Sequence, residues 1–198
     1  MFTLILAIAT PVSTNSKLVK TYGRSLAKMF SGHPQPEPFD PSKGEESVWQ
    51  YPRPPKIEKI SDKIEIIFNG VKIVDAEGGY RILETSHPPT YYINPAGIKM
   101  EYFKQKGTSG SFCEWKGSAS YYDIEVNAKT APGAAWVYKN PTGMFSGIKD
   151  HIAVYARPMD TCTVAGQIVT PQPGNFYGGW ITSKIKGPFK GIPGSNFW

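Results

Sequence analysis

The chain has 198 residues, a net charge of +6 and an apolar fraction of 40%, with 13% aromatic residues. This length is enough for one domain with a core, and the composition excludes an intrinsically disordered protein. The 18 prolines and 20 glycines follow no fixed period, which is typical of a turn-rich β protein and unlike a helical bundle. The basic residues form no run of five, so a solvated surface is a better interpretation than a nucleic-acid contact.

Residues 1–46 are predicted to be an N-terminal lead and linker. The apolar run at 2–12 is shorter than the ~20 residues that span a bilayer, and it lacks a preceding positive segment. Residues 16–30 are basic, hydroxyl-bearing and free of acids, as in an organelle transit peptide, although an upstream extension without function fits equally well. Residues 31–46 are rich in proline and read as a linker. We therefore expect no membrane span and a cytoplasmic location, or a chloroplast if the lead is a transit peptide.

The first strands are marked by turn signals. Asn69-Gly70 separates apolar runs at 64–68 and 71–74, and this dipeptide predicts a hairpin because a type I′ turn needs positive φ at both central residues. Gly78-Gly79 is expected to end the second strand. Further strands are predicted at 80–85 and 91–93, with a loop at Pro88-Pro89 because proline cannot donate to a ladder.

The rest of the chain continues this pattern. Residues 96–104 predict one or two helical turns, and strands follow at 118–126, 135–138, 151–155, 162–164 and 167–169. Short strands at this spacing favour an antiparallel sheet, sandwich or open barrel, and no long helical period supports a Rossmann fold. The tail, residues 171–198, is rich in glycine and proline but carries six aromatic residues. Because disordered segments lack aromatics, we expect the tail to pack as an irregular strap.

Five sequence motifs resemble one known family. They are VWQYPRPPKIE, RILETSHPPTYYI, SFCEWKGSASYYD, AAWVYKNP and HIAVYA, in this order. Together they resemble the domain-of-unknown-function family 427 over residues 46–198, and the tail resembles the extension of its longer members. The resemblance implies a β-rich fold with a solvent-open central cavity. Some catalogues label the family a nucleotidyltransferase domain. The expected fold is a single mainly β domain at 47–198, an open barrel or bent sheet of short antiparallel strands with a central cavity.

The family motifs also indicate a candidate ligand site. Charged residues inside apolar strand runs must be paired or face water, and the concave side of a curved sheet brings distant positions together. An aromatic-walled volume with a few fixed charges is the usual form of a small-ligand site. The residues predicted to line it are Arg81, Glu84, Tyr92, Lys116, Tyr122 and Trp136. Arg81 and Lys116 supply donors only, so the ligand is expected to be anionic or of mixed charge.

Simpler interpretations compete with this site. Arg81 and Glu84 stand three apart on a strand, so they point to opposite faces and fit structural ion pairs with neighbouring strands. Adjacent Tyr91/Tyr92 and Tyr121/Tyr122 must also split between the faces, so one of each pair can build the core and the other a cavity wall.

The sequence assigns no catalytic residue. Cys113 is expected to be a buried inert thiol, because nothing in the sequence places a histidine near it to act as a base. Cys113 and Cys162 have no zinc-site spacing, so neither a metal nor a cofactor is predicted, and two cysteines fit a reducing compartment. The D-x-E pair, Asp123 and Glu125, lacks the Gly-Ser helix start and the P-loop that nucleotide chemistry uses.

Three functional hypotheses follow. The leading one is a domain that binds a small polar or anionic ligand in an open cavity, with or without a reaction there. The first alternative is a non-catalytic protein-interaction or scaffold module, in which the aromatic tail and basic residues dock a partner. The second is a nucleotidyltransferase-like activity, as the family label implies. A cavity where Arg81, Glu84 or Lys116 converge would favour the first hypothesis, and a large flat aromatic patch would favour the scaffold.

Overall fold

The structure, a computed structural model, describes residues 34–198, and the predicted targeting segment lies outside this range. Residues Pro36–Trp198 form one compact unit. Within the described residues, no helix is long and apolar enough to cross a membrane. The helices found there are single 3-10 turns or pairs of them: η1 (Pro41–Lys43), η2 (Val48–Gln50), η3 (Pro95–Gly97), η4 (Met100–Tyr102) and η5 (Gly143–Ile148).

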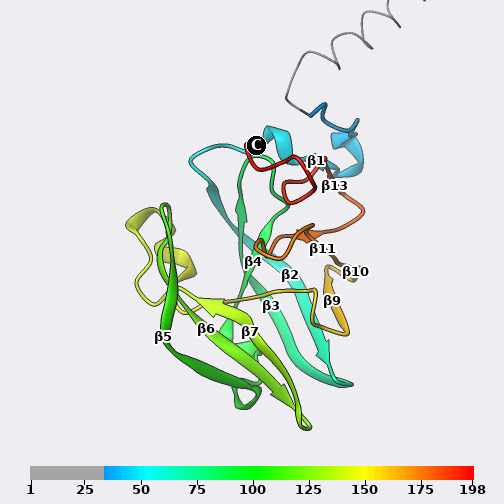
Figure 1. Cartoon of the computed structure of the whole chain (residues 1–198). Coiled ribbons are helices and arrows are strands. Elements are labelled where there is room, and N and C mark those ends of the chain that lie inside the picture. Colours follow the sequence, from blue (N-terminus) through cyan, green and yellow to red (C-terminus); the bar gives the residue numbers. More distant parts are fainter. Residues whose placement is uncertain (1–33) are drawn as a thin grey trace, which may run out of the picture. The chain divides into compact units, whose positions relative to one another are not determined.

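Two antiparallel meanders build the main sheet (Figure 1). The first consists of β2 (Lys56–Phe68), β3 (Val71–Leu83) and β4 (Thr90–Ile93), and the second of β5 (Phe103–Cys113), β6 (Gly117–Val126), β7 (Lys129–Val137) and β8 (Ile152–Val154). They join where β4 pairs with β8. On the far side of β2 lie β9 (Thr161–Val164) and then β10 (Gln167–Ile168), which gives the order β10-β9-β2-β3-β4-β8-β7-β6-β5. The edges β5 and β10 do not pair, so the sheet is bent and open. The mainly β prediction is confirmed.

The glycine pair inside β3 has a different role from the predicted one. Gly78 and Gly79 have φ of 71° and 144°, but β3 runs through them to Leu83. A Cβ on Gly79 would lie 2.3 Å from the carbonyl oxygen of Tyr92, so only glycine lets β4 approach this closely. The register of β2 against β3 shifts at the same place, between Ile60 and Lys63. The pair therefore bends the strand at a bulge, and the predicted break is wrong.

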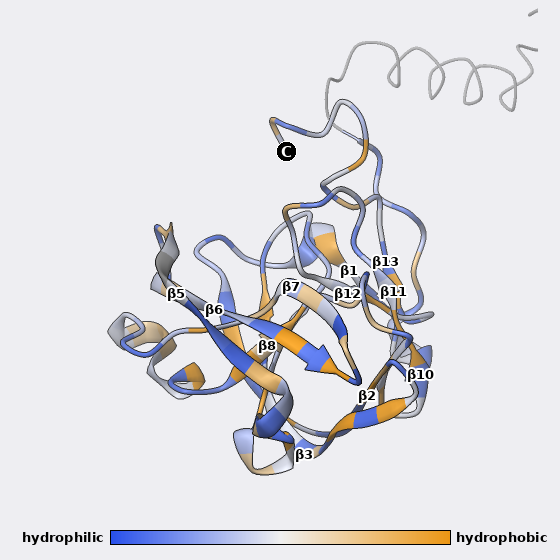
Figure 2. Ribbon diagram, turned by 60° about the horizontal axis from the view of Figure 1, so that its bottom comes forward, coloured by the Kyte–Doolittle hydropathy of each residue, from blue (hydrophilic) through white to orange (hydrophobic). Residues whose placement is uncertain are grey.

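The other local predictions fare unequally. The Asn69-Gly70 hairpin is confirmed, with φ of 48° and 74°. The helical turns predicted at 96–104 are η3 and η4, after which β5 begins at Phe103. Strand β5 was not predicted, because its sequence, FKQKGTSGSFC, shows no regular alternation of apolar residues. This strand forms by pairing with β6, where apolar and polar residues alternate (Figure 2).

The two faces of the sheet bury different side chains. Antiparallel partners point to the same face, and Tyr80 pairs with Tyr92 while Tyr121 pairs with Trp136. Tyr92 and Trp136 belong to one apolar cluster, packed by η5 through Phe145 and Ile148. Tyr91 and Tyr122 belong to the main core on the opposite face, with Ile64, Ile66, Phe68 and Ile124. The predicted division of both tyrosine pairs is observed.

The tail crosses the sheet as an irregular strap, which we define as residues 170–198. It includes β11 (Thr170–Pro171), paired with β12 (Trp180–Ile181), and β13 (Ile185–Lys186), which runs parallel to β1 (Glu46–Ser47). Trp180 is 1% exposed, and its indole Nε1 donates to the carbonyl oxygen of Val154 at 2.9 Å. The buried Gln172 amide donates to the Lys190 carbonyl and accepts from the Gly179 N–H. The predicted strap is thus an integral part of the packed domain.

Part of the segment predicted as a linker contacts this strap. The Glu37 N–H donates to the Gly187 carbonyl at 2.9 Å, and the Gly187 N–H donates to the Glu37 carboxylate. Glu45 forms an ion pair with Lys186 at 3.2 Å. Residues from Pro36 onward therefore contribute to the same compact unit as the sheet.

Candidate functional site

Two adjoining cavities lie between the sheet and the strap. The basic cavity, named for Lys106 and Arg157 in its wall, has a volume of about 460 Å³. The aromatic cavity, named for Trp136, Tyr92 and Tyr138, has a volume of about 290 Å³. Both are lined by Tyr121, Tyr155, Gln172, Tyr177 and Gly178. Because these residues form a common wall, the cavities can be treated as two parts of one site.

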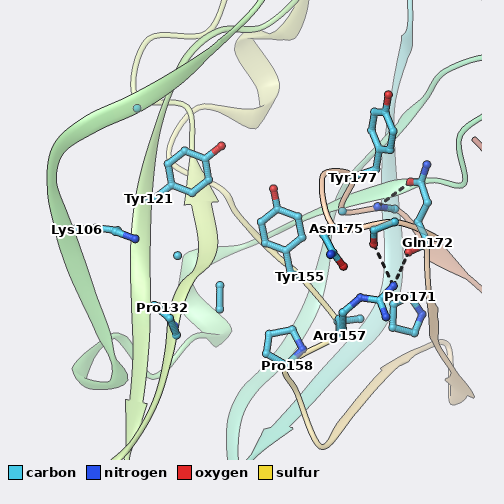
Figure 3. Close-up of a pocket in the computed structure, with 17 residues that line it drawn as sticks. Lys106, Tyr121, Pro132, Tyr155, Arg157, Pro158, Pro171, Gln172, Asn175 and Tyr177 are labelled. Carbon is cyan, nitrogen blue, oxygen red and sulfur yellow. Dashed lines mark hydrogen bonds between the residues drawn. The ribbon is translucent and has the colours of Figure 1, made fainter. Parts of the chain in front are cut away.

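The basic cavity contains two cations and no carboxylate in its lining (Figure 3). Lys106 extends from the edge strand β5, and its amine makes no ion pair with the described residues. Arg157, after β8, donates from Nη2 to the carbonyl oxygens of Gln172 and Gly174, at 3.2 and 3.0 Å. These bonds fix the strap and leave the Nε and Nη1 hydrogens of Arg157 for another acceptor.

Two tyrosines of the shared wall, Tyr155 and Tyr177, have a raised pKa and are neutral at physiological pH. Burial raises the pKa of Tyr155 to about 12. Burial also raises the pKa of Tyr177 above its ordinary value. The Tyr155 hydroxyl donates to the carbonyl oxygen of Phe176 at 3.2 Å, which ties β8 to the strap. Tyr155 and Tyr177 therefore add no negative charge, and Lys106 and Arg157 keep the cavity electropositive.

The aromatic cavity is built around Trp136 on β7. The Trp136 and Tyr155 ring centroids are 4.5 Å apart, and the Trp136 Nε1 donates to the Tyr92 hydroxyl at 3.4 Å. Burial raises the pKa of Tyr92 well above its ordinary value, so this phenol is uncharged. Gly178 lies against the indole, since a Cβ there would be 2.2 Å from Cη2 of Trp136. The strap can pack here only because position 178 has no side chain.

Three of the five charged side chains that line the aromatic cavity have polar partners. Arg53 and Glu84 form an ion pair at 2.7 Å. The Lys190 amine donates to the carbonyl oxygen of Trp198 at 2.6 Å. Lys116 has no ion pair among residues 34–198, and its amine lies 5.9 Å from the ring centroid of Phe145. The exposed Glu114 also lines this cavity, so its charge is mixed.

His87 also lines the aromatic cavity. Its Nδ1 is 2.9 Å from the carbonyl oxygen of Thr85, a contact that requires the proton on Nδ1. Burial lowers the pKa of His87, so the neutral ring is favoured at physiological pH. The ring also packs edge-on against Tyr177, with centroids 4.8 Å apart. His87 thus holds Tyr177 in the shared wall and keeps Nε2 as an acceptor.

Four of the six predicted site residues lie together. Glu84, Tyr92, Lys116 and Trp136 all line the aromatic cavity. Arg81 lies on the opposite face, where it forms ion pairs with Glu46 at 2.8 Å and Glu58 at 2.7 Å. It lines a separate polar cavity of about 430 Å³.

Tyr122 also lies outside the two cavities. It packs in the main core, with its ring centroid 6.3 Å from that of Phe103. Its neighbour Tyr121 takes the cavity position, because Tyr121 pairs with Trp136 and shares its face. The tyrosine pair was therefore the right feature, but the residue chosen from it was the one that faces the core.

Several lining residues were missed by the sequence analysis. Lys106 stands in the unrecognised strand β5, and Asn175 and Tyr177 come from a tail without regular periodicity. Tyr155 had a signal, since it is part of the motif HIAVYA. Asp123 and Glu125 lie outside both cavities, and Asp123 accepts the Gly133 N–H. Across residues 34–198, no group of three or more histidine, cysteine or acidic side chains is arranged to hold a metal ion.

The two cysteines differ in accessibility. Cys113 was predicted to be buried, but it is partly exposed and lines the aromatic cavity. Cys162 is 3% exposed in the main core, and burial raises its pKa to about 12. We therefore expect iodoacetamide to alkylate Cys113 in the native protein and Cys162 only after denaturation. Peptide mass spectrometry checks this, and equal rates at both residues would contradict the placement of Cys113.

The fold and these cavities define a mainly antiparallel β domain with an open sheet and a site covered by a strap. Residues 56–165 match the model of a family described as a domain of unknown function, DUF427. The chain belongs to this family. No curated protein matches the chain. The matched region ends before residues 170–198, so the strap wall of both cavities lies beyond it.

Proposed function

We propose that this domain binds a small anionic ligand in the basic cavity. The observation that carries the proposal is the charge of the lining, which includes Lys106 and Arg157 but no carboxylate. A cavity of about 460 Å³ is within the range that holds small ligands. Hydrogen bonds from a charged donor to an acceptor contribute about 1.5–3 kcal/mol each, so two such donors can give measurable affinity.

The geometry favours this function over nucleotidyl transfer. That reaction places carboxylates around the transferred phosphorus, through two bound cations. The two D-x-E pairs, Asp75 with Glu77 and Asp123 with Glu125, contribute to neither cavity. The carboxylates that line the aromatic cavity are Glu84, which is paired with Arg53, and the exposed Glu114.

Pyrophosphate is a suitable probe for the anion site, measured by its effect on the melting temperature. We expect it to stabilise the wild-type protein, and we expect Lys106→Glu to weaken binding by about tenfold or more, because one donor becomes a repelling carboxylate. Lys104→Glu is the matched control. It makes the same charge change on the same strand, but Lys104 lines neither cavity.

The two variants separate a defined site from general attraction to a basic protein. If pyrophosphate stabilises the wild-type protein and Lys104→Glu but not Lys106→Glu, the basic cavity binds the anion. Equal stabilisation of all three proteins, or of none, would contradict the proposal. Measurements at two salt concentrations test the mechanism further, since a site governed by charge loses affinity as salt increases.

A further inference from the structure

We infer that the ligand is an aromatic anion, with its planar ring in the aromatic cavity and its anionic group in the basic cavity. This inference rests on the proposed function and specifies the class of ligand. It is motivated by two exposed phenylalanines at the aromatic cavity and by the unequal distribution of charge between the two cavities.

The cavities adjoin along their shared wall. Tyr121, Tyr155 and Tyr177 line both of them, so a molecule held by Lys106 and Arg157 can extend along these rings into the aromatic cavity. Side chains on both sides of this path are fixed. Tyr155 is bonded to the strap at Phe176, and Tyr177 is packed by His87. A preformed path of this kind reduces the entropy lost on binding.

Two large apolar side chains of the aromatic cavity are uncovered. Phe112 is 77% exposed at the end of β5, and Phe176 is 78% exposed on the strap. Both line the aromatic cavity. Covering apolar surface is favourable, and aromatic rings contact each other through offset stacking or edge-to-face packing. A planar ring in the aromatic cavity would cover part of the phenyl surface that water now contacts.

Charge sets the orientation of the ligand. The aromatic cavity includes two carboxylates, Glu84 and Glu114, whereas the lining of the basic cavity has none. Arg53 is committed to Glu84 and the Lys190 amine is bonded to Trp198, which leaves Lys116 as the cation of this lining that has no polar partner among residues 34–198. An anionic group is therefore more stable beside Lys106 and Arg157, and the uncharged ring is left for the aromatic cavity.

Two fluorescent probes test both parts of this inference. The first is 8-anilinonaphthalene-1-sulfonate, an aromatic anion. The second is N-phenyl-1-naphthylamine, which has the same rings without the sulfonate. We expect the anion to bind the folded protein about tenfold or more tightly than the neutral probe, and Lys106→Glu to remove this difference.

The ring position is tested by alanine substitution at the exposed phenylalanines. Phe112→Ala and Phe176→Ala should each lower the affinity for the sulfonate probe by about five- to tenfold, because each removes one aromatic contact. Phe197→Ala is the matched control, since Phe197 is 98% exposed and lines neither cavity. Melting curves establish that each variant is folded, and sedimentation measures whether any of them changes the mass of the particle.

Cys113 reports the occupation of the aromatic cavity independently of affinity. With the sulfonate probe at ten times its Kd, alkylation of Cys113 should slow by about tenfold, because only the free protein reacts. In denatured protein the same probe concentration should leave alkylation of Cys113 and Cys162 unchanged. The neutral probe at the same concentration should protect less, in line with its weaker binding.

The outcomes distinguish this inference from the proposed function. One outcome is that pyrophosphate binds as proposed while the sulfonate probe does not slow Cys113 alkylation and binds the phenylalanine variants as tightly as the wild-type protein. In that case the ring position is wrong and the anion site stands. If Lys106→Glu changes neither pyrophosphate nor probe binding, both fail. If Phe112→Ala or Phe176→Ala dissociates an oligomer and leaves the probe affinity unchanged, the phenyl groups are a protein interface and the inference is overturned.

Discussion

Replacing Trp180 by alanine is expected to lower the free energy of unfolding by about 3–5 kcal/mol. The side chain is 1% exposed, its ring packs against Tyr91 with centroids 5.3 Å apart, and its Nε1 donates to Val154. The substitution leaves a cavity in the main core and an unpaired backbone carbonyl. Urea denaturation of both proteins at the same pH measures the difference.

A second strap residue gives the control for this loss. Phe197→Ala also removes a large aromatic side chain, but Phe197 is 98% exposed, so the free energy of unfolding should change by less than about 0.5 kcal/mol. If Trp180→Ala were as stable as Phe197→Ala, the strap would not be part of the packed core. Trp180→Ala should also weaken pyrophosphate binding, since the displaced strap carries one wall of the basic cavity.

Replacing Arg81 by methionine is expected to destabilise the protein by about 2–4 kcal/mol. The Arg81 side chain is 20% exposed and joins Glu46 before β2 to Glu58 within it. Removing the guanidinium takes the cation away from the partly buried Glu46 and one of two from Glu58, which still pairs with Lys56, while methionine preserves most of the apolar stem. Lys63→Met is the control, because the Lys63–Asp75 pair is about half exposed and should contribute much less to stability.

The same variant decides whether Arg81 has a second role in the ligand site. Arg81 lies on the face of Tyr91, away from the two cavities. Pyrophosphate should therefore raise the melting temperature of Arg81→Met by as much as that of the wild-type protein. A smaller rise in the melting temperature of the variant would show that Arg81 contributes to anion binding, as was predicted from the sequence.

The sequence predicted the sheet well where strand and turn chemistry are local. Asn69-Gly70 sets the β2–β3 hairpin, and the alternating residues of β6 mark a strand with one buried face. Strand β5 escaped prediction because its order comes from pairing with β6 and not from its own apolar pattern. Gly78 and Gly79 were predicted to break the strand because two adjacent glycines are typical of a turn. They are required instead by a tertiary contact, the close approach of the Tyr92 backbone, which the local sequence does not reveal.

The candidate site shows what a single sequence leaves undetermined. Alternation establishes that Tyr121 and Tyr122 face opposite sides, but only the register with Trp136 shows which of them faces the cavity. Arg81 was placed in the site because charges in apolar strands need partners. Its partners are acids from β1 and β2, and both pairings depend on the fold. Lys106 and Tyr177, from β5 and the strap, belong to the segments where sequence periodicity is weakest.

A crystal structure of the protein with 8-anilinonaphthalene-1-sulfonate tests the two-cavity account most directly. The account predicts the sulfonate within hydrogen-bonding distance of Lys106 or Arg157 and the aromatic rings between Phe112 and Phe176. A probe bound outside both cavities, or one with its sulfonate beside Lys116 and its rings beside Arg157, would contradict it.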